Sequence, residues 1–484
     1  MVRSSTRTLV VALALLAVTF IAPVFAVSPK TDASVPEIKL ADIESIRLLS
    51  PNNLPIKVLV VASWQSQTVK FVANLVRIVA KIHELDGLRG ADSFKVMVFG
   101  AFQETFDVLE KELGKDTMKR FVEQAPLKID SDVWMQDWGE IGTVKLRGEE
   151  KPRLLILDAN RSAASMMFYE GGLVGPALTK SWNACYLKNP SQQPRGGDMG
   201  GNIEVTPCDV LVVGNTITPE FRELFAKCGY RDRMIEVEAD WLTVGHCDEY
   251  LSIVPNDKTG EGFTLVKGDP ALALKLVLDA DREEIENIQL KEYREQMLFL
   301  YDYLHSDHES AKRWVSLLRA YEPYSGYAGG QRFPRITFAG AMNTPEKFSK
   351  TTADLFIRQN LALAGVIDQN VDKLCDRINQ VHRLGSRAHS IISFPMLYGK
   401  KNNRYLGYLP GVINQLILRK HLVIADPKMK LFRDSIRASV ARFGLTPHFI
   451  DDTPYHKLWG DVHCATNVLR DPDRYIVRPK HLGK

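Results

Sequence analysis

Cysteine is scarce in this chain of 484 residues, which contains six. Disulfide-dependent domains are small and have a much higher cysteine density, so a disulfide scaffold is excluded as the basis of the fold. Long apolar runs are scarce as well, because no stretch after residue 27 could cross a bilayer as a helix. The chain must therefore fold around an ordinary hydrophobic core, for which 45% hydrophobic residues are ample.

An excess of charge of either sign is also missing. The chain has 62 basic and 58 acidic side chains, which gives a formal net charge of +4. This balance does not produce the basic surface that attracts nucleic acids or anionic membranes, so we expect neither as a partner. Low-complexity tracts and recognisable sequence repeats are absent too.

The N-terminus has the pattern of an export signal. Two arginines precede an almost wholly apolar run from Leu9 to Ala22, and Val24 and Ala26 place small residues at the −3 and −1 positions of a cleavage site. An uncleaved anchor is the alternative, because Leu9 to Val27 nearly spans a membrane. The flank that follows is not basic, which favours cleavage. We predict a signal peptide over 1–26, a secreted mature protein, and no stable membrane insertion after cleavage.

Aliphatic segments alternate with amphipathic ones along the rest of the chain. Strands are predicted at 57–62, 94–99, 154–157, 210–213, 234–237 and 250–254. Helices are predicted at 69–84, 104–124, 361–384, 412–420 and 434–443. This alternation predicts an α/β fold, with one domain over 57–484 and a polar linker or N-terminal arm over 27–56. A charged segment of helical period predicts a helical insertion at about 270–345.

Four short segments are dense in polar residues between apolar flanks. They are Trp134-Met135-Gln136-Asp137, Gly200-Gly201-Asn202-Ile203-Glu204, Gly245-His246-Cys247-Asp248-Glu249 and Gly460-Asp461-Val462-His463-Cys464-Ala465-Thr466-Asn467. In a strand, His246 and Asp248 point to the same face, although a polar strand end explains the pattern equally well. Cys464 has the setting of a nucleophile, but a lone cysteine is more often a small buried hydrophobe.

Together, the four segments resemble the catalytic domain of the protein-arginine deiminases, members of the pentein or guanidino-modifying superfamily. Trp134 to Asp137 is similar to the family's Trp-(Ile/Met)-Gln-Asp. Asp240 to Glu249 is similar to its Asp-Trp-Leu-(Ser/Thr)-Val-Gly-His-x-Asp-Glu, and Gly460 to Asn467 to its Gly-Glu-Val-His-Cys-Gly-Thr-Asn. The resemblance runs from about residue 57 to 475, apart from the helical insertion. It implies a five-bladed α/β propeller, the pentein fold, around a central site.

The resemblance also implies a reaction, the hydrolysis of an arginine guanidinium to citrulline with release of ammonia. Asp137 and Asp248 then clamp the guanidinium nitrogens, as paired carboxylates suit its planar donors. Cys464 attacks the central carbon to form a covalent thiouronium. His246 protonates the departing ammonia and then activates water.

Two further residues are expected to bind the substrate. Trp134 is placed to line a slot around the aliphatic stem and to add a cation–π contact. Arg161 matches a family arginine that contacts the substrate, and its planar donors suit the carbonyls beside a peptidyl arginine. Ala163 and Leu458 stand where family members carry two other arginines. The expected partners are arginine-containing peptides or proteins.

A calcium site is implied by the same resemblance, because the animal members of the family are calcium-activated. The ligands of one family site correspond to side chains or carbonyls of Gln136, Glu140, Gly200, Ile203 and Glu204. All-oxygen donors of this kind suit Ca²⁺. At a second family site, Trp138 and Ser162 replace two ligands while Asp158 is kept, so the resemblance supports one Ca²⁺ site.

Other functions compete with this interpretation. A deiminase of a small guanidine, such as free arginine or agmatine, shares the nucleophile and the carboxylates. A non-catalytic binding protein on the same fold is a further alternative. All four catalytic positions hold competent residue types, which argues against it. A papain-like protease is excluded, because its cysteine precedes its histidine, whereas His246 precedes Cys464.

Overall fold

Six β-sheets carry the fold of the computed structural model, which describes residues 35–64, 67–164, 170–326, 343–344, 348–384 and 388–478. All of these residues belong to one compact unit, 35–484. The other unit, 1–34, lies outside the described residues, and so does the predicted signal peptide. No helix in the described ranges is long and apolar enough to cross a membrane.

One connectivity recurs in five of these sheets, namely a first strand, an antiparallel second strand, a helix, and a third strand parallel to the second. Three of these ββαβ units have short crossovers with one main helix each: β5 (Gly139–Leu146), β6 (Arg153–Asp158), α5 (Val174–Trp182), β7 (Cys185–Lys188); β8 (Ile203–Val205), β9 (Leu211–Gly214), α6 (Pro219–Phe225), β10 (Met234–Val237); and β17 (Leu416–Leu418), β18 (His421–Ala425), α12 (Lys430–Ala441), β19 (Thr446–Ile450). In the first, the short helix α4 (Arg161–Ala164) precedes α5, and in the second the π-helix η7 (Ala226–Tyr230) follows α6. The sixth sheet is a two-stranded ribbon of β15 (Tyr398–Lys401) and β16 (Arg404–Gly407).

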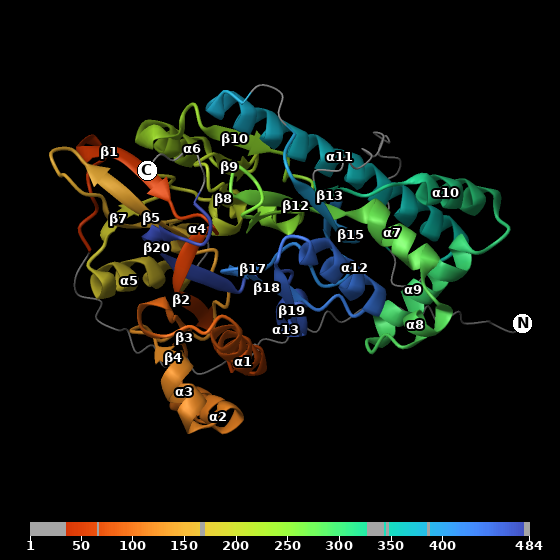
Figure 1. The fold of residues 1–484 in the computed structure, drawn as a ribbon, viewed down its shortest axis with the longest axis horizontal. Helices are drawn as coiled ribbons and strands as arrows, with labels where there is room; N and C mark the ends of the chain where they lie inside the picture. Colours follow the sequence, from red (N-terminus) through yellow and green to blue (C-terminus); the bar gives the residue numbers. More distant parts are fainter. Residues whose placement is uncertain are drawn as a thin grey trace, which may run out of the picture. The chain divides into compact units, whose positions relative to one another are not determined.

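One unit is built from both ends of the described chain. Its first strand is β20 (Thr466–Tyr475), which pairs antiparallel with β2 (Asn53–Val61), and the two lie side by side in Figure 1. The unit continues through α1 (Val69–Leu85) to β3 (Lys95–Phe99), and β4 (Val122–Gln124) forms the sheet edge. Part of the predicted 27–56 arm is also a strand, β1 (Ile43–Leu48), which pairs with β5.

The remaining unit contains a long excursion between its second and third strands. β11 (Leu251–Pro255) and β12 (Phe263–Asp269) are followed by α7 (Pro270–Asp279), α8 (Arg282–Glu286), α9 (Lys291–Leu304), α10 (Glu309–Ala320), β13 (Ser325–Gly326), α11 (Lys350–His382) and β14 (Ile391–Pro395). These helices bury a core of their own around Leu300, Trp314 and Phe356. Figure 1 shows α7 and α10 beside α11, with α8 next to α9 at the lower end of the group. Residues 327–342 of the predicted insertion lie outside the described residues.

The central strands are aliphatic because they are covered on both faces. Val58 to Ala62 and Leu422 to Ala425 are entirely buried, which is why such strands appear in sequence as continuous apolar runs. All six cysteines are free, so no disulfide bond contributes to the fold. The fold is therefore held by core packing.

Two predicted helices are wrong. Residues 104–124 form α2 (Gln103–Leu113), α3 (Lys115–Phe121) and β4, because Gly114 adopts a φ of +77° and ends α2. Residues 412–420 contain β17 and the turn into β18. Short, fully buried apolar runs have the same composition in helices and in strands, so periodicity could not separate them.

Candidate active site

The four polar segments lie at equivalent places, each just before the first strand of a ββαβ unit. Asp137 comes before β5, Gly200 before β8, Asp248 before β11 and Cys464 before β20. A fifth segment, at Asn414, precedes β17 in the same way. Side chains far apart in sequence meet at these strand starts, as the contacts below show.

A pocket of about 400 Å³ lies at this meeting point. Its polar lining comes from Asp137, Arg161, Arg195, His246 and Cys464. Its apolar lining includes Trp134, Leu458 and Trp459. Trp134 packs against Gly460 so closely that a Cβ added there would lie 2.3 Å from the indole. Glycine at 460 therefore makes room for the tryptophan beside the nucleophile segment.

The Cys464 thiol is buried and held by Asn414. The amide nitrogen of Asn414 lies 3.2 Å from Cys464 Sγ and donates to Asp248 Oδ2 at 2.8 Å. The amide oxygen of Asn414 accepts the Cys464 backbone N–H at 3.0 Å. Burial and the nearby carboxylates of Asp248 and Asp137 raise the pKa of the thiol well above its usual range. The site thus positions the sulfur while disfavouring the thiolate, which a bound cation would instead favour.

Asp137 and Asp248 each have one oxygen that is fixed and one that is free. Asp137 Oδ2 accepts from Arg161 at 3.0 Å, and Asp248 Oδ2 lies 2.8 Å from His463 Nδ1 as well as from Asn414. Both Oδ1 atoms are buried without a hydrogen-bond partner among the described residues. Burial also raises the pKa of Asp137, although Arg161 opposes this. Because an unpaired buried carboxylate oxygen is costly, the pair suits a ligand that brings N–H donors and positive charge.

His246 is oriented by the backbone. Its Nε2 lies 2.8 Å from the Gly196 carbonyl, and a carbonyl can only accept, so Nε2 carries the proton. Its Nδ1 is buried, has no hydrogen-bond partner in the described residues, and lies 3.9 Å from Asp137 Oδ1. Nδ1 is therefore the nitrogen available for proton transfer.

The segment from His246 to Glu249 is not a strand, so the alternation considered for His246 and Asp248 does not apply. His246 is extended, but Cys247 to Glu249 form a 3₁₀ turn, and Glu249 Oε1 accepts the His246 N–H at 3.1 Å. His246 and Asp248 still reach the same site, through the turn rather than through strand alternation.

Arg161 is buried and fully engaged by carboxylates. Its Nε and Nη2 bond to Asp132 at 2.7 and 3.1 Å, and its Nη1 bonds to Asp137 at 3.0 Å. This pairing orients Asp137. Arg195, by contrast, is exposed on the pocket lining and forms no ion pair within the described part of the chain.

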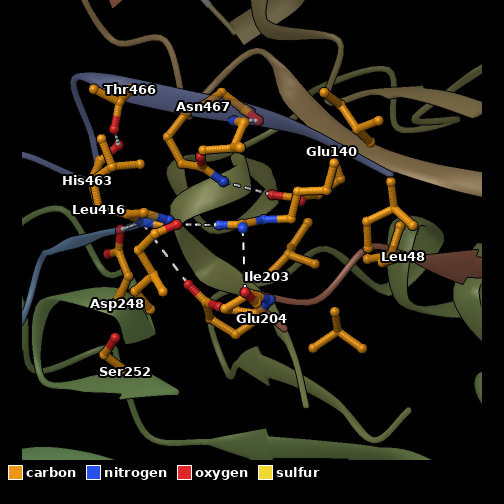
Figure 2. Close-up of a pocket in the computed structure, with 18 of the residues that line it drawn as sticks. Leu48, Glu140, Ile203, Glu204, Asp248, Ser252, Leu416, His463, Thr466 and Asn467 are labelled. Atoms are coloured by element: carbon orange, nitrogen blue, oxygen red, sulfur yellow. Dashed lines mark hydrogen bonds and ion pairs between the residues drawn. The ribbon is translucent and has the colours of Figure 1, made fainter. Parts of the chain in front are cut away.

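A second cavity, of about 60 Å³, is lined by four of the five predicted metal ligands. It is lined by Gln136, Glu140, Ile203, Glu204, Asp248 and His463, among others. Figure 2 shows the two glutamates together with Asp248 and His463 around it. Burial raises the pKa of Glu204 to about 7. Burial and the charge of Glu204 raise the pKa of Glu140 well above its usual range. Two buried carboxylates that repel each other are the donor chemistry of a hard cation.

Gly200 belongs to the same cavity region. A Cβ added at Gly200 would lie 2.7 Å from Glu140 Oε1 and 2.3 Å from the Gln136 carbonyl, so glycine keeps this space open. No group of three or more His, Cys, Asp or Glu side chains in the described ranges is placed to hold a metal ion. A calcium ion there would therefore depend on amide and backbone oxygens in addition to the glutamates.

Three residues of the site were not predicted from the sequence: Asn414, His463 and Asp132. Asn414 was assigned to a helix, and its position before β17, which repeats that of the other segments, is the signal that could have revealed it. His463 was quoted only as a neighbour of Cys464, yet it bonds to Asp248. Asp132 lies just before the Trp134 motif, and only its contact with Arg161 distinguishes it.

Comparisons with known proteins agree with the motifs. The sequence profile described as "Protein-arginine deiminase (PAD)" matches residues 99–475. Protein-arginine deiminase type-3 of Rattus norvegicus is 26% identical over 370 residues, which covers 71% of this chain and 47% of that protein. The type-1 enzyme of Homo sapiens is 25% identical over 368 residues, covering 71% and 46%. The chain thus spans about half the length of these curated relatives.

A solved structure adds a likeness of fold. The X-ray structure of a candidate agmatine deiminase matches with a TM-score of 0.50 at 9% identity, covering 90% of this chain and 99% of that one. This match concerns the mixed α/β fold alone. The family profile covers more than half of the sequence, and the chain belongs to the protein-arginine deiminase family of hydrolases.

Proposed function

We propose that this chain hydrolyses peptide-borne arginine to citrulline and releases ammonia. The observation that carries the proposal is the pair of buried carboxylates, Asp137 and Asp248, beside an oriented thiol and imidazole. Each carboxylate has an Oδ1 without a hydrogen-bond partner among the described residues. A guanidinium is planar, always cationic, and has five N–H donors. It supplies both the donors and the charge that these two oxygens lack.

The bound guanidinium also favours the deprotonated form of Cys464. Its positive charge offsets the carboxylates that raise the thiol pKa. The thiol proton passes to His246 Nδ1, and Sγ forms a bond to the guanidinium carbon. A C–N bond then breaks, and His246 returns the proton to the departing ammonia. Water attacks the same carbon as His246 takes one of its protons, the C–S bond breaks, and His246 returns that proton to the sulfur. The protonated urea group gives its extra proton to ammonia, which leaves as ammonium, and the thiol and citrulline remain.

Free arginine is the competing substrate, and one observation favours it. Arg195 is an exposed cation on the pocket lining that suits an α-carboxylate. We favour a peptide because Trp134 and the pocket's apolar lining accept the arginine stem, which both substrates share, and extend beyond it. Comparing kcat/KM for benzoyl-arginine amide, free arginine and agmatine decides the matter. A higher value for either free compound would assign the chain to small guanidines.

The decisive test is replacement of the nucleophile. Cys464→Ser should abolish citrulline formation, whereas Cys247→Ser should not, because Cys247 is a fully buried neighbour of Asp248 that does not line the pocket. Both variants should unfold near the wild-type temperature. Unchanged turnover in Cys464→Ser would refute the mechanism. Peptide binding without turnover by the wild type would favour a binding protein.

We also propose one Ca²⁺ site, formed by Gln136, Glu140, Glu204 and the carbonyls of Gly200 and Ile203. Support comes from the family resemblance and from the two buried glutamates, whose charged forms burial disfavours; Arg470 and His463 on the same cavity lining offset part of their charge. When bound, Ca²⁺ would neutralise that charge and order the segment carrying Asp137, which adjoins Gln136.

The larger arrangement and the location of the protein are proposals of the same kind. We infer that the five ββαβ units are the blades of a pentein propeller, supported by their repeated connectivity, by the β2–β20 pairing, and by the five polar segments at equivalent strand starts. We propose secretion on the pattern of residues 1–26. Terminal sequencing of the exported protein should then begin at Val27, and an unprocessed Met1 would exclude cleavage.

A further inference from the structure

Two large apolar side chains stand next to each other on the rim of the pocket. Leu458 and Trp459 are 49% and 46% exposed, and both line the pocket. The other large hydrophobic side chains exposed to this degree in the described ranges, such as Phe102 at 48%, are not part of its lining. Adjacent apolar surface at the mouth of a reactive pocket is typical of a contact surface for a ligand.

The backbone holds Trp459 in an unusual conformation. Its φ is +75°, which a glycine adopts freely but a bulky residue rarely does. The turn is fixed after α13 (Thr453–His456), where the Leu458 N–H bonds to the Tyr455 carbonyl at 2.8 Å and the Trp459 N–H to the His456 carbonyl at 3.1 Å. Strained backbone of this kind persists where the surroundings impose it and is enriched at ligand sites.

The rim is continuous with the arginine slot. Gly460, the next residue, packs directly against Trp134, and a Cβ there would also lie 3.2 Å from Cys464 Cβ. Adjacent residues of a peptide have Cα atoms about 3.8 Å apart. A side chain flanking an arginine whose guanidinium reaches Cys464 therefore lies at the mouth of the pocket, where Leu458 and Trp459 are exposed.

We propose that Leu458 and Trp459 form a subsite for an apolar or aromatic side chain next to the target arginine. The inference rests on the proposed deiminase activity and names the peptide class that the site prefers. An acidic neighbour is the rival, because two cations lie close by: Arg195 lines the pocket, and Lys401 Nζ lies 4.8 Å from the centre of the Trp459 ring. We favour the apolar occupant because the exposed surface that it would cover consists of the Trp459 indole and the Leu458 side chain.

The test compares capped peptides that differ in one flank. Citrulline formation is measured for Ac-Gly-Arg-Gly-NH2 and for the same peptide with Phe or Asp before or after the arginine. We expect the better Phe peptide to exceed the Gly peptide about tenfold in kcat/KM, the scale on which an apolar contact discriminates. Trp459→Gly, which removes the indole and accepts the positive φ, should bring this ratio close to one.

Two more variants provide a second rim substitution and a control. Leu458→Ala removes the neighbouring side chain at a position with ordinary backbone, so its ratio should also fall even if Trp459→Gly folds poorly. Phe102→Ala removes an equally exposed aromatic residue away from the pocket and should leave the ratio unchanged. Equal turnover of all peptides by the wild type, or an unchanged ratio in both rim variants, would overturn the subsite, and a preference for Asp would replace it with a charged one.

Failure of the subsite and failure of the proposed function give different results. If the wild type turns over no peptide, the deiminase proposal fails, whatever the flank. Binding of the same peptides to Cys464→Ala, measured by calorimetry, then tests the rim alone. If the Phe peptide binds Cys464→Ala about tenfold more tightly than the Gly peptide, and the difference is lost when Trp459→Gly is added, the subsite is supported. Equal affinities of the two peptides for Cys464→Ala refute it.

Discussion

Removing the side chain of Asn414 should impair both the reaction and the fold. Asn414→Ala deletes the hydrogen bonds from its amide to Cys464 Sγ and Asp248, and it removes the acceptor of the Cys464 N–H. A buried donor left without a partner costs about 1–3 kcal/mol. Because Asn414 is buried and its loss also leaves a small void, we expect the free energy of unfolding to fall by about 2–4 kcal/mol.

The effect on the reaction comes through position, since Asn414 holds the sulfur and one carboxylate in place. A misplacement of reacting groups by about 1 Å can cost about 100-fold, so we expect kcat to fall about 10- to 100-fold, with a smaller change in KM. That loss corresponds to about 1.4–2.7 kcal/mol of transition-state stabilisation. Asn414→Asp should be more damaging than Asn414→Ala despite its shape, because it places another carboxylate against Asp248 and loses the donor to the sulfur.

The assay combines steady-state citrulline formation with urea denaturation of each variant. Cys247→Ser is the matched control for disturbance near the site, and it should keep kcat. A kcat for Asn414→Ala within about twofold of wild type would show that the observed hydrogen bonds do not position the nucleophile. A better rate for Asn414→Asp than for Asn414→Ala would contradict the electrostatic part of the argument.

Three other predictions concern the surroundings of the site and the stability of the fold. Gly201→Ala should reduce turnover at least about 100-fold, because its Cβ would lie 2.6 Å from His246 Nδ1; kinetics near the wild-type rate would refute this. Added Ca²⁺ should raise the melting temperature of the wild type but not of Glu204→Gln, and equal melting curves with Ca²⁺ and with a chelator would refute the metal site. Burial and the neighbouring ring of His421 lower the pKa of His448 from 6.5 to about 4. The unfolded chain therefore binds this proton first, and the protein loses stability as the pH falls from 6.5 to 4. Relative to the wild type, the free energy of unfolding of His448→Gln should rise by about 2–3 kcal/mol across that window in urea titrations. Parallel plots of unfolding free energy against pH for the two proteins would refute this.

Local chemistry was accessible from the sequence. Asp137, His246, Asp248 and Cys464 each lie in a motif of a few residues with apolar flanks, and the same motifs pointed to the family that the profile match shows. The α/β alternation was readable too, because strands covered on both faces are continuous aliphatic runs. The prediction failed where a short run was compatible with two conformations, as at 412–420, and where a single glycine ended a helix, as at Gly114.

Tertiary structure alone decided how the site residues are paired. Asn414 lies 50 residues from Cys464 and 166 from Asp248, and His463 lies 215 from Asp248, so no local pattern could join them. The same holds for Arg161: the family resemblance implied a substrate contact, and only the fold shows that Asp132 and Asp137 lie against its guanidinium. A residue's type determines what its side chain can bond, and its motif indicates where it stands in the chain. Which oxygen is occupied, which remains free, and how far burial raises a pKa depend on neighbours that only the folded chain brings together.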